Sequence, residues 1–370
     1  MAERVMWNRI VALIIKELRQ LLSSRRNVMV LLTPLILQLA IFPFATTLEV
    51  KNATLAILNE DEGAPAIELI QRLSYASAFS QVISLHDEDE QRQVIDRQAA
   101  LLSIRVPPDF SRKVLAGEPV ALQALIDGRR SNAAQIAFSY IQQVTADFSR
   151  EYGAQPPASL VVRNLYNPNL DYIWFVLPCL VAIIATVGCL LVTALSLARE
   201  REEGTFDQLL VTPLTPAYIM LGKSVPGILV SMTQGAIIAL AAVFVYGVPF
   251  VGSIWLLALA TFAYALSLCG VGLLISAISS SQQQAFLGVF CYMVPSVVLS
   301  GYLAPVENMP TFLRGVSEAN PLTHFIIISK GIFLKGYGLT EAGPALLALL
   351  GISVVTMILA HTVFWRQTKT

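Results

Sequence analysis

Apolar residues gather in six long, nearly uninterrupted stretches of the 370-residue chain. A helix needs about 20 mostly apolar residues to cross the hydrocarbon core of a bilayer, and each stretch reaches roughly that length. The pattern therefore predicts six membrane-spanning helices, at 28–48, 172–198, 224–247, 254–279, 285–303 and 343–365. Between the first two stretches the pattern changes, and short apolar runs alternate with charged ones.

The third, fourth and fifth predicted spans lie in one run, from Ser224 to Val306, that contains no Asp, Glu, Lys, Arg or His. This run of 83 residues is too long for one or two spanning helices. It is interrupted by Gly and Pro at 246–253 and by a Ser- and Gln-rich segment at 279–284. Such segments favour turns, so we expect three antiparallel neighbouring helices.

The segment 50–168 predicts an α/β domain with a mixed sheet. Apolar runs predict strands at 54–58, 81–85, 100–106 and 121–127, and a further strand at 160–165 is a candidate to close the sheet. Apolar residues at helical spacing predict helices at 65–76, 87–98 and 131–152, and Asp109 is expected to cap a short one. The acidic run 87–90 is interpreted as a solvated helix start, with a metal or partner site as the alternative.

Composition supports the membrane interpretation. Only 14% of the residues are charged and 55% are hydrophobic, and 25 basic residues balance 25 acidic ones. A typical soluble domain has about 25% charged residues. These values exclude a soluble enzyme of ordinary composition, a disordered chain and a basic nucleic-acid-binding protein.

The distribution of the charges predicts the topology. Residues 1–27 carry six basic and two acidic side chains, whereas 49–171 carries 11 basic and 16 acidic ones. Basic residues near helix ends stay in the cytoplasm, so the N-terminus is expected there. Six crossings return the C-terminus to the same side, and 49–171 then lies outside. A cleaved signal peptide is the alternative for the first stretch, but no clear small-x-small cleavage site follows it.

Two segments on the predicted cytoplasmic side are amphipathic. The N-terminal helix at 4–22 has an apolar stripe opposite Arg9, Lys16 and Arg19, which is typical of a helix lying among lipid headgroups. A simple extension of the first span is the alternative. The second segment, 199–213, places charged residues before apolar ones and predicts a short helix that can fill a partner's groove.

Motifs of catalysis are missing from the sequence. Gly222-Lys223-Ser224 resembles the end of a phosphate-binding loop, but Ala217 stands where that motif needs its first Gly. The three histidines have no metal-ligand spacing, and all four cysteines fall in apolar stretches. The predicted spans lack the ionisable residues that ion-driven carriers place at the midplane. We therefore expect no enzymatic activity, metal or cofactor on this chain, and an energy source on another protein.

Several motifs resemble those of the membrane subunits of ABC-2 type exporters. The first is Glu-Arg-Glu-x-Gly-Thr-x-x-x-Leu-Leu-x-Thr-Pro at 200–213, followed by Gly222-Lys223-x-x-Pro226. The others are Ser300-Gly301-Tyr302, Pro305-x-Glu307-Asn308-Met309-Pro310, Asn320-Pro321-Leu322-Thr323-His324-Phe325 and Gly331-Ile332-Phe333-Leu334-Lys335-Gly336. The resemblance covers nearly the whole chain. Segments 42–50 and 164–172 look most similar to the paired inner-membrane permeases of the bacterial Ybh-type multidrug exporter.

The resemblance implies a multi-pass permease in a bacterial inner membrane, with partners. It implies a separate ATP-binding-cassette ATPase, which holds ATP and Mg and docks on the cytoplasmic segment, and a second permease chain, identical or paralogous. In Ybh-like systems it also implies a periplasmic membrane-fusion protein and an outer-membrane channel. It further implies that 304–342 forms two re-entrant half-helices rather than a seventh span.

We therefore predict an α-helical polytopic membrane protein with six transmembrane helices and an inserted α/β extracytoplasmic domain between helices 1 and 2. The expected parts are an interfacial helix at 1–27, the first span at 28–48, the periplasmic domain at 49–171, the second span at 172–198, a coupling segment at 199–223, spans three to five at 224–303, re-entrant half-helices at 304–342, the sixth span at 343–365 and a cytoplasmic tail at 366–370. The expected function is ATP-driven export of hydrophobic or amphipathic drugs. Export of lipids, glycolipids or polysaccharides by the same architecture and a membrane-anchored ligand-sensing scaffold are the alternatives.

Three groups of residues are candidates for function. Coupling to the ATPase is expected at Arg199, Glu200, Arg201, Glu202, Gly204, Thr205, Phe206, Leu209, Leu210 and Pro213. The candidate pathway lining is aromatic, with helix packing as the alternative role, and comprises Tyr264, Phe286, Phe290, Tyr292 and Tyr302. The re-entrant segment is marked by Pro305, Glu307, Asn308, Pro310, Asn320 and Pro321.

Overall fold

The computed structural model of the chain describes residues 2–45, 53–76, 79–97, 99–126, 131–152, 171–206, 208, 211 and 214–367. The chain forms two compact units. Unit 1 comprises Met1–Ala45 together with Leu165–Thr370, and unit 2 comprises Thr46–Asn164.

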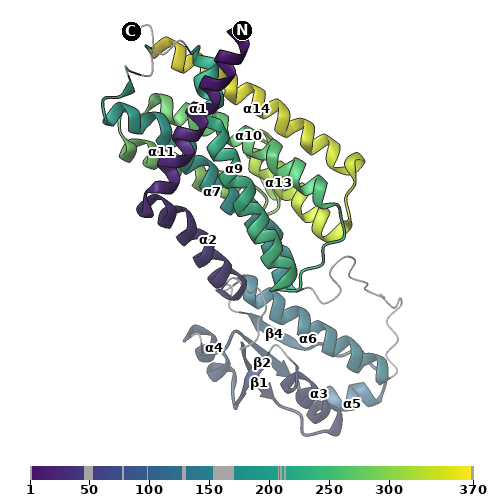
Figure 1. Ribbon diagram of the computed structural model, residues 1–370. Coiled ribbons are helices and arrows are strands. Elements are labelled where there is room, and N and C mark those ends of the chain that lie inside the picture. The colour runs from purple at the N-terminus through teal and green to yellow at the C-terminus, as the bar shows by residue number, and fades with distance from the viewer. Residues whose placement is uncertain are drawn as a thin grey trace. The chain divides into compact units, whose positions relative to one another are not determined.

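Unit 1 is a helical bundle built around α7 (Tyr172–Glu202) (Figure 1). The other long apolar helices are α9 (Pro216–Phe244), α10 (Ile254–Ile278), α11 (Gln282–Leu299) and α14 (Leu339–Gln367). In the most apolar window of α7, 83% of the residues are buried, compared with 22% in α14 and 17% in α11. Helix α7 is therefore central, whereas α11 and α14 keep apolar faces for lipid or another chain.

The number of spans depends on how the first two helices are counted. Five helices in the described ranges are long and apolar enough to cross a membrane. Helices α1 (Ala2–Ser23) and α2 (Arg25–Ala45) add a sixth only if they form one broken span, because Trp7–Ser23 and Val28–Phe42 meet at 67°. The chain is thus a polytopic helical protein, and the count of six stays a prediction.

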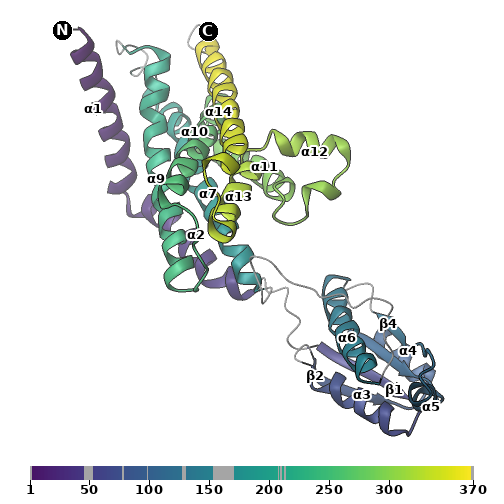
Figure 2. The same cartoon turned by 90° about the vertical axis from the view of Figure 1, so that its right-hand side faces the viewer.

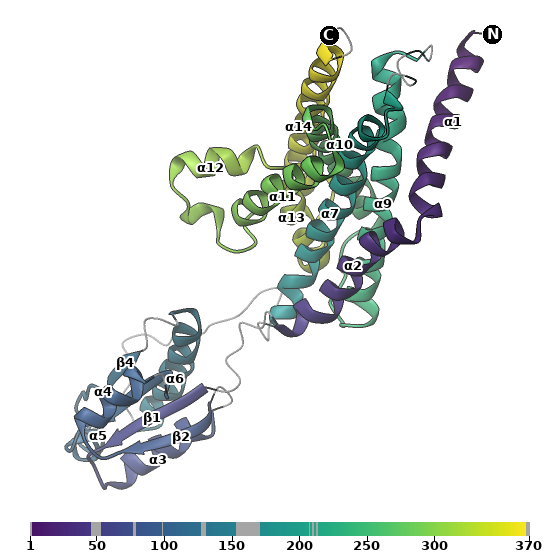
Figure 3. The same cartoon turned by 90° about the vertical axis from the view of Figure 1, so that its left-hand side faces the viewer.

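Helix α1 lies beside α9 at one side of the bundle, and α12 lies at the other (Figure 2). Ile10 and Leu13 of α1 are buried, whereas Arg9 and Lys16 are exposed, so this part of the apolar stripe packs on protein. Both α1 and α14 have their chain-terminal ends at the same end of unit 1 (Figure 3).

Helix α9 begins at Pro216 rather than at the predicted 224. Proline suits the first turn of a helix, because an N–H group at that position would have no hydrogen-bond partner within the helix. The prediction placed the boundary after Lys223 because it treated that charge as lying outside the span. In the structure Lys223 lies within the helix, where neighbouring carboxylates compensate its charge.

Between α11 and α14 the chain forms short elements instead of one long helix. These are the 3-10 turn η2 (Val306–Asn308), α12 (Thr311–Glu318), α13 (Pro321–Lys330) and the π-helical turn η3 (Gly331–Lys335). Most of α13 is buried, whereas α12 is largely exposed. The turn η3 accepts hydrogen bonds from the loop between α9 and α10, from Val251 N–H (3.2 Å) and Gly252 N–H (2.9 Å). Re-entry of this region into a membrane stays a prediction.

Unit 2 is a four-stranded mixed sheet with helices on both faces. The strands are β1 (Ala53–Asn59), β2 (Phe79–Leu85), β3 (Leu102–Val106) and β4 (Gln123–Ile126), in the order β2-β1-β3-β4. Strand β1 is parallel to β2 and β3, and β4 is antiparallel to β3. The predicted strand at 160–165 lies outside the described residues.

Successive residues of β1 face opposite sides of the sheet and pack against different helices of unit 2. Leu55 and Ile57 point into the core formed with α3 (Ala64–Ser74), α5 (Phe110–Leu115) and α6 (Ser131–Glu151), whereas Ala56 and Leu58 face α4 (Glu88–Asp96). A central strand buried on both faces reads as a continuous apolar run, which is the pattern at 54–58.

Polar side chains secure two of the loops in unit 2. Asp87 caps α4 by accepting a hydrogen bond from Glu90 N–H (2.7 Å), whereas Asp109 precedes α5 without a capping bond and pairs with Lys113 instead. Burial raises the pKa of Asp61, but hydrogen bonds from the N–H groups of Ser111 and Gly63 outweigh it and hold this pKa below its ordinary value.

Candidate functional site

The predicted coupling segment begins as the last turn of α7. The helix runs on to Glu202, and Gly204 ends it with a left-handed backbone (φ 70°). Gly204 N–H binds Arg201 O (3.2 Å) and Thr205 N–H binds Glu200 O (2.8 Å), the Schellman pattern. Residues 199–202 therefore extend α7 rather than begin the predicted short helix, because their side chains favour the continuing helix and Gly204 favours its end.

After the turn, Phe206 folds back onto the bundle. Its ring packs edge-on against Phe364 of α14, with centroids 6.0 Å apart. Leu209, Leu210 and Pro213 lie outside the described residues.

Arg201 joins the end of α7 to two other helices. Its guanidinium donates to the carbonyls of Ala277 (2.5 Å) and Ser279 (3.0 Å) at the end of α10, and to Gln367 Oε1 (2.5 Å) at the end of α14. It also lies 4.8 Å from the centre of the Phe206 ring. Helix ends leave carbonyls without partners, so Arg201 satisfies groups that would otherwise lack them. Arg201 therefore links the ends of α7, α10 and α14.

Glu200 instead faces α1 and α9, where it belongs to an ionic cluster formed by Lys16, Glu17, Ser196, Glu200 and Lys223. Lys223 Nζ donates to Glu17 Oε1 (2.9 Å) and to Ser196 Oγ (3.0 Å), and lies 3.1 Å from Glu200 Oε2. The Lys223 side chain is 0% exposed and that of Glu200 is 5% exposed. Glu200 also pairs with the half-exposed Lys16 (3.0 Å). The ionic cluster is electrically neutral and spans α1, α7 and α9.

Sequence reasoning missed the ionic cluster. Glu200 was expected at a partner surface, and Lys223 was considered only as part of an incomplete phosphate-binding loop. A buried ammonium requires carboxylate partners because unpaired burial is costly. Lys223 at the start of an apolar run was the available signal, but Glu17 is 206 positions away along the chain, and local patterns do not reveal such a pair.

Two hollows flank the ionic cluster. The first, the apolar cavity, has a volume of about 420 Å³ and lies between the α1–α2 elbow, α7, α9 and α11. Its lining comprises Glu17, Leu21, Val30, Leu31, Leu191, Val192, Leu195, Ser196, Arg199, Pro226, Gln282, Gln283 and Phe286. The second is called the polar groove because seven of its ten lining residues are polar or charged. It has a volume of about 630 Å³ and lies between α1 and the segment around the end of α7. Its lining comprises Arg9, Ala12, Leu13, Lys16, Gln20, Glu200, Glu203, Thr205, Gln208 and Leu214.

The polar residues around the end of α7 are thus distributed among different environments. Arg199 borders the apolar cavity, and Glu203 and Thr205 border the polar groove. Glu202 is exposed and accepts a hydrogen bond from Gln282 N–H (2.9 Å), at the start of α11.

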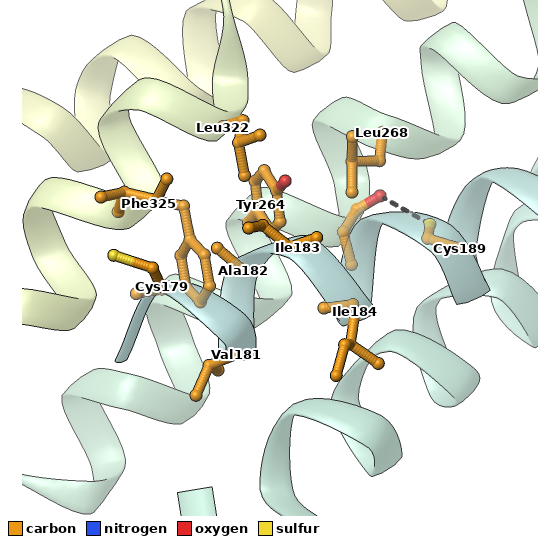
Figure 4. Packing of buried hydrophobic residues seen from close by; sticks show 14 of the residues in the cluster. Cys179, Val181, Ala182, Ile183, Ile184, Cys189, Tyr264, Leu268, Leu322 and Phe325 are labelled. Atoms are coloured by element: carbon orange, nitrogen blue, oxygen red, sulfur yellow. Dashed lines mark hydrogen bonds between the residues drawn. The ribbon is translucent and has the colours of Figure 1, made fainter. Parts of the chain in front are cut away.

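The five aromatic residues predicted to line a pathway do not form one group. Tyr264 is fully buried, stacks on Phe325 with centroids 4.4 Å apart, and shares a hydrogen bond with Thr186 (2.5 Å). Figure 4 shows Tyr264 and Phe325 within the apolar core, near Ile183. Tyr302 is also buried and stacks on Phe175.

The remaining three aromatic residues are all on α11. Phe286 and Phe290 are about half exposed (54% and 53%), and Tyr292 is partly buried. Of the five, only Phe286 borders the apolar cavity.

The residues predicted for the re-entrant segment act at the ends of short elements. Asn320 caps α13 by accepting from Leu322 N–H (3.1 Å), donates to Ser296 O of α11 (2.8 Å), and precedes Pro321 in the first turn. Pro305 and Pro310 precede η2 and α12, with Glu307 and Asn308 inside η2. In the described part of the chain, no three His, Cys, Asp or Glu side chains are arranged to hold a metal ion.

Comparison with known proteins gives consistent matches over both units. A family model described as "ABC-2 family transporter protein" matches residues 27–361. "Probable multidrug ABC transporter permease YbhR" of Escherichia coli is 48% identical over 98% of this chain and 100% of its own length. "Inner membrane transport permease YhhJ" of E. coli is 30% identical over 91% and 92%, and "Probable multidrug ABC transporter permease YbhS" of E. coli is 26% identical over 98% and 97%.

Proposed function

Because the chain belongs to the ABC-2 family of transporter proteins, we propose that it is the membrane permease of an ATP-driven exporter of amphipathic drugs. The proximity of an apolar cavity and a polar groove at the end of α7 carries the proposal. Two of its relatives carry the name "Probable multidrug ABC transporter permease", which supports drugs as the substrate class.

The polar groove is the proposed docking site of the ATPase. Its walls carry both signs of charge, from Arg9 and Lys16 on α1 and from Glu203 after α7. Complementary charges at an interface fix register and suppress wrong partners. ATP and Mg are proposed to bind to that partner, so this chain transmits the motion and performs no hydrolysis.

The apolar cavity is the proposed drug-binding part of the pathway. Its volume lies in the range of small-molecule sites, and its apolar wall ends in polar groups such as Arg199 and Gln283. The half-exposed Phe286 and Phe290 beside it are proposed to face a second permease chain, identical or paralogous. Two such chains enclose a common path between them.

The proposed setting is a bacterial inner membrane with both termini in the cytoplasm. The basic N-terminal segment and the ends of α1 and α14 at one end of unit 1 support this orientation. Unit 2 and the segment 304–342 are then periplasmic, and unit 2 is the proposed contact for a membrane-fusion protein and an outer-membrane channel.

Co-purification tests the docking site. Glu203→Lys reverses an exposed charge in the polar groove, and we expect it to lower the amount of ATPase that co-purifies with the chain. Glu318→Lys is the matched control, because Glu318 is also an exposed acid but lies at the end of α12. Equal recovery of ATPase with both variants contradicts the proposed docking site.

A further inference from the structure

The ionic cluster separates the two hollows, and its members line both. Glu17 and Ser196 border the apolar cavity, whereas Lys16 and Glu200 border the polar groove. Lys223 borders neither hollow, yet its ammonium contacts both sides. The buried ammonium of Lys223 therefore lies between the proposed drug-binding surface and the proposed docking surface.

The two carboxylates depend on the same ammonium. Glu17 on α1 and Glu200 on α7 lie 2.9 and 3.1 Å from Lys223 Nζ. Glu200 has a second cation in Lys16, but that ammonium is half exposed and more strongly screened. When Glu200 shifts away, Glu17 becomes the main partner of the Lys223 ammonium. When Glu17 shifts away, Glu200 becomes its main partner. Because Coulomb attraction is stronger inside a protein than in water, such an exchange of partners changes the energy of the ionic cluster appreciably.

The backbone around the ionic cluster transmits such shifts because α1 and α9 are in close contact. A Cβ placed on Gly222 would lie 2.6 Å from Leu13 Cδ2, so α1 packs directly on the helix that carries Lys223. Close packing has few alternative arrangements, and packed elements respond to local shifts by moving as units. Movement of α1 displaces Glu17 and Leu21, which line the apolar cavity.

We propose that Lys223 is a positioning residue that links occupancy of the apolar cavity to the ATPase bound in the polar groove. This inference rests on the proposed function. Docking or ATP binding moves the end of α7 and Glu200, Lys223 redistributes its contacts, and α1 reshapes the cavity wall. The link between the two binding steps is reciprocal, so a drug in the cavity alters how the partner binds to the groove and to ATP. Through these binding steps the drug changes the rate of the partner's ATPase.

A merely structural role for Lys223 predicts a different result. If the ammonium only stabilises the fold, its removal lowers yield and thermal stability, and reduces basal and drug-stimulated ATPase in parallel. If the ammonium links the two hollows, its removal changes the ratio of drug-stimulated to basal ATPase activity. The ratio of stimulated to basal activity is therefore the informative readout.

The test uses the full chain with its partner subunits in proteoliposomes and rhodamine 6G as an amphipathic probe. For Lys223→Gln we expect the stimulation by rhodamine 6G to fall to about 1-fold, while basal ATPase persists. Lys223→Arg restores the charge and is expected to recover stimulation. Ser224→Ala is the control, because Ser224 is equally buried and its hydroxyl bonds only to Met220 O of its own helix. Stimulation in Lys223→Gln equal to that of the unchanged complex overturns the inference.

A second measurement needs no variant and covers poor folding of Lys223→Gln. The Kd of rhodamine 6G is measured for the unchanged permease with and without the ATPase bound. The inference predicts two different values, and equal values overturn it. Failure of the proposed function is distinguishable, because the unchanged complex then transports no dye with ATP.

Discussion

Arg201 provides a sharp test of how the end of α7 is held. Arg201→Ala removes three hydrogen bonds, to the carbonyls of Ala277 and Ser279 and to Gln367, and the contact with the Phe206 ring. Arg201→Lys keeps the charge but loses the planar, multivalent donor geometry. The comparison separates geometry from charge.

The expected loss can be estimated from these contacts. A hydrogen bond from a charged donor contributes about 1.5 kcal/mol at the low end, and a partly exposed cation–π contact about 0.5–1 kcal/mol. Together they give about 5 kcal/mol. Arg201 is only partly buried, so water replaces about half of this in the variant, leaving a loss of about 2.5 kcal/mol. Lysine retains one of the three bonds, so Arg201→Lys is expected to lose about two-thirds as much.

Thermal unfolding of the purified protein measures the difference. A loss of this size lowers the Tm by roughly 5 °C for a chain of this class. Arg199→Ala is the matched control, because Arg199 is a neighbouring half-buried arginine that borders the apolar cavity. The reasoning is refuted if Arg201→Ala unfolds at the same temperature as Arg199→Ala, or if Arg201→Lys is as damaging as Arg201→Ala.

Three further predictions follow from packing and protonation. Gly222→Leu is expected to push α1 away at Leu13 and to lower the free energy of unfolding by about 1–3 kcal/mol. Adding Leu13→Ala is expected to restore the Tm, and a Tm that does not recover contradicts this contact. Tyr264→Ala is expected to lower the free energy of unfolding by about 3–5 kcal/mol. Tyr264→Phe removes only the hydrogen bond to Thr186 and is expected to lower it by about 1 kcal/mol. An unchanged Tm with altered drug selectivity contradicts this core role and supports a role in the pathway. Because the pKa of Asp61 is lowered, its ionised form stabilises unit 2 above the unfolded pKa, and this is lost as the pH falls through the folded value. Proteolysis of unit 2 is therefore expected to be faster in Asp61→Asn at pH 7 and to approach that of the unchanged protein below about pH 4; a constant difference contradicts the assignment.

Local pattern predicted much of the fold. The apolar run with flanking turns placed the fourth span at 254–279, and α10 is Ile254–Ile278. The apolar run at 54–58 predicted a strand, and β1 is Ala53–Asn59. The motifs at 200–213 and 300–336 predicted the family, and the matches to ABC-2 transporters confirm it. These features depend on neighbours along the chain, which the sequence displays directly.

The candidate site was harder to predict because its contacts join distant segments. A charge at a helix end reads as a boundary, so Lys223 was placed outside the membrane span, although Glu17 and Glu200 compensate it within the bundle. Hydropathy also does not tell which face of a helix is buried. Tyr264 and Phe286 were equal candidates for the pathway, but the first is in the core and the second is half exposed.

The most direct test of the central claim is transport by the reconstituted complex. The chain is purified with its ATP-binding partner, placed in proteoliposomes, and the movement of rhodamine 6G is followed with ATP, without ATP, and with a partner that cannot hydrolyse ATP. The account predicts directional dye transport that requires both this chain and hydrolysis. Dye movement that persists without hydrolysis, or no transport by a complex that does hydrolyse ATP, contradicts it.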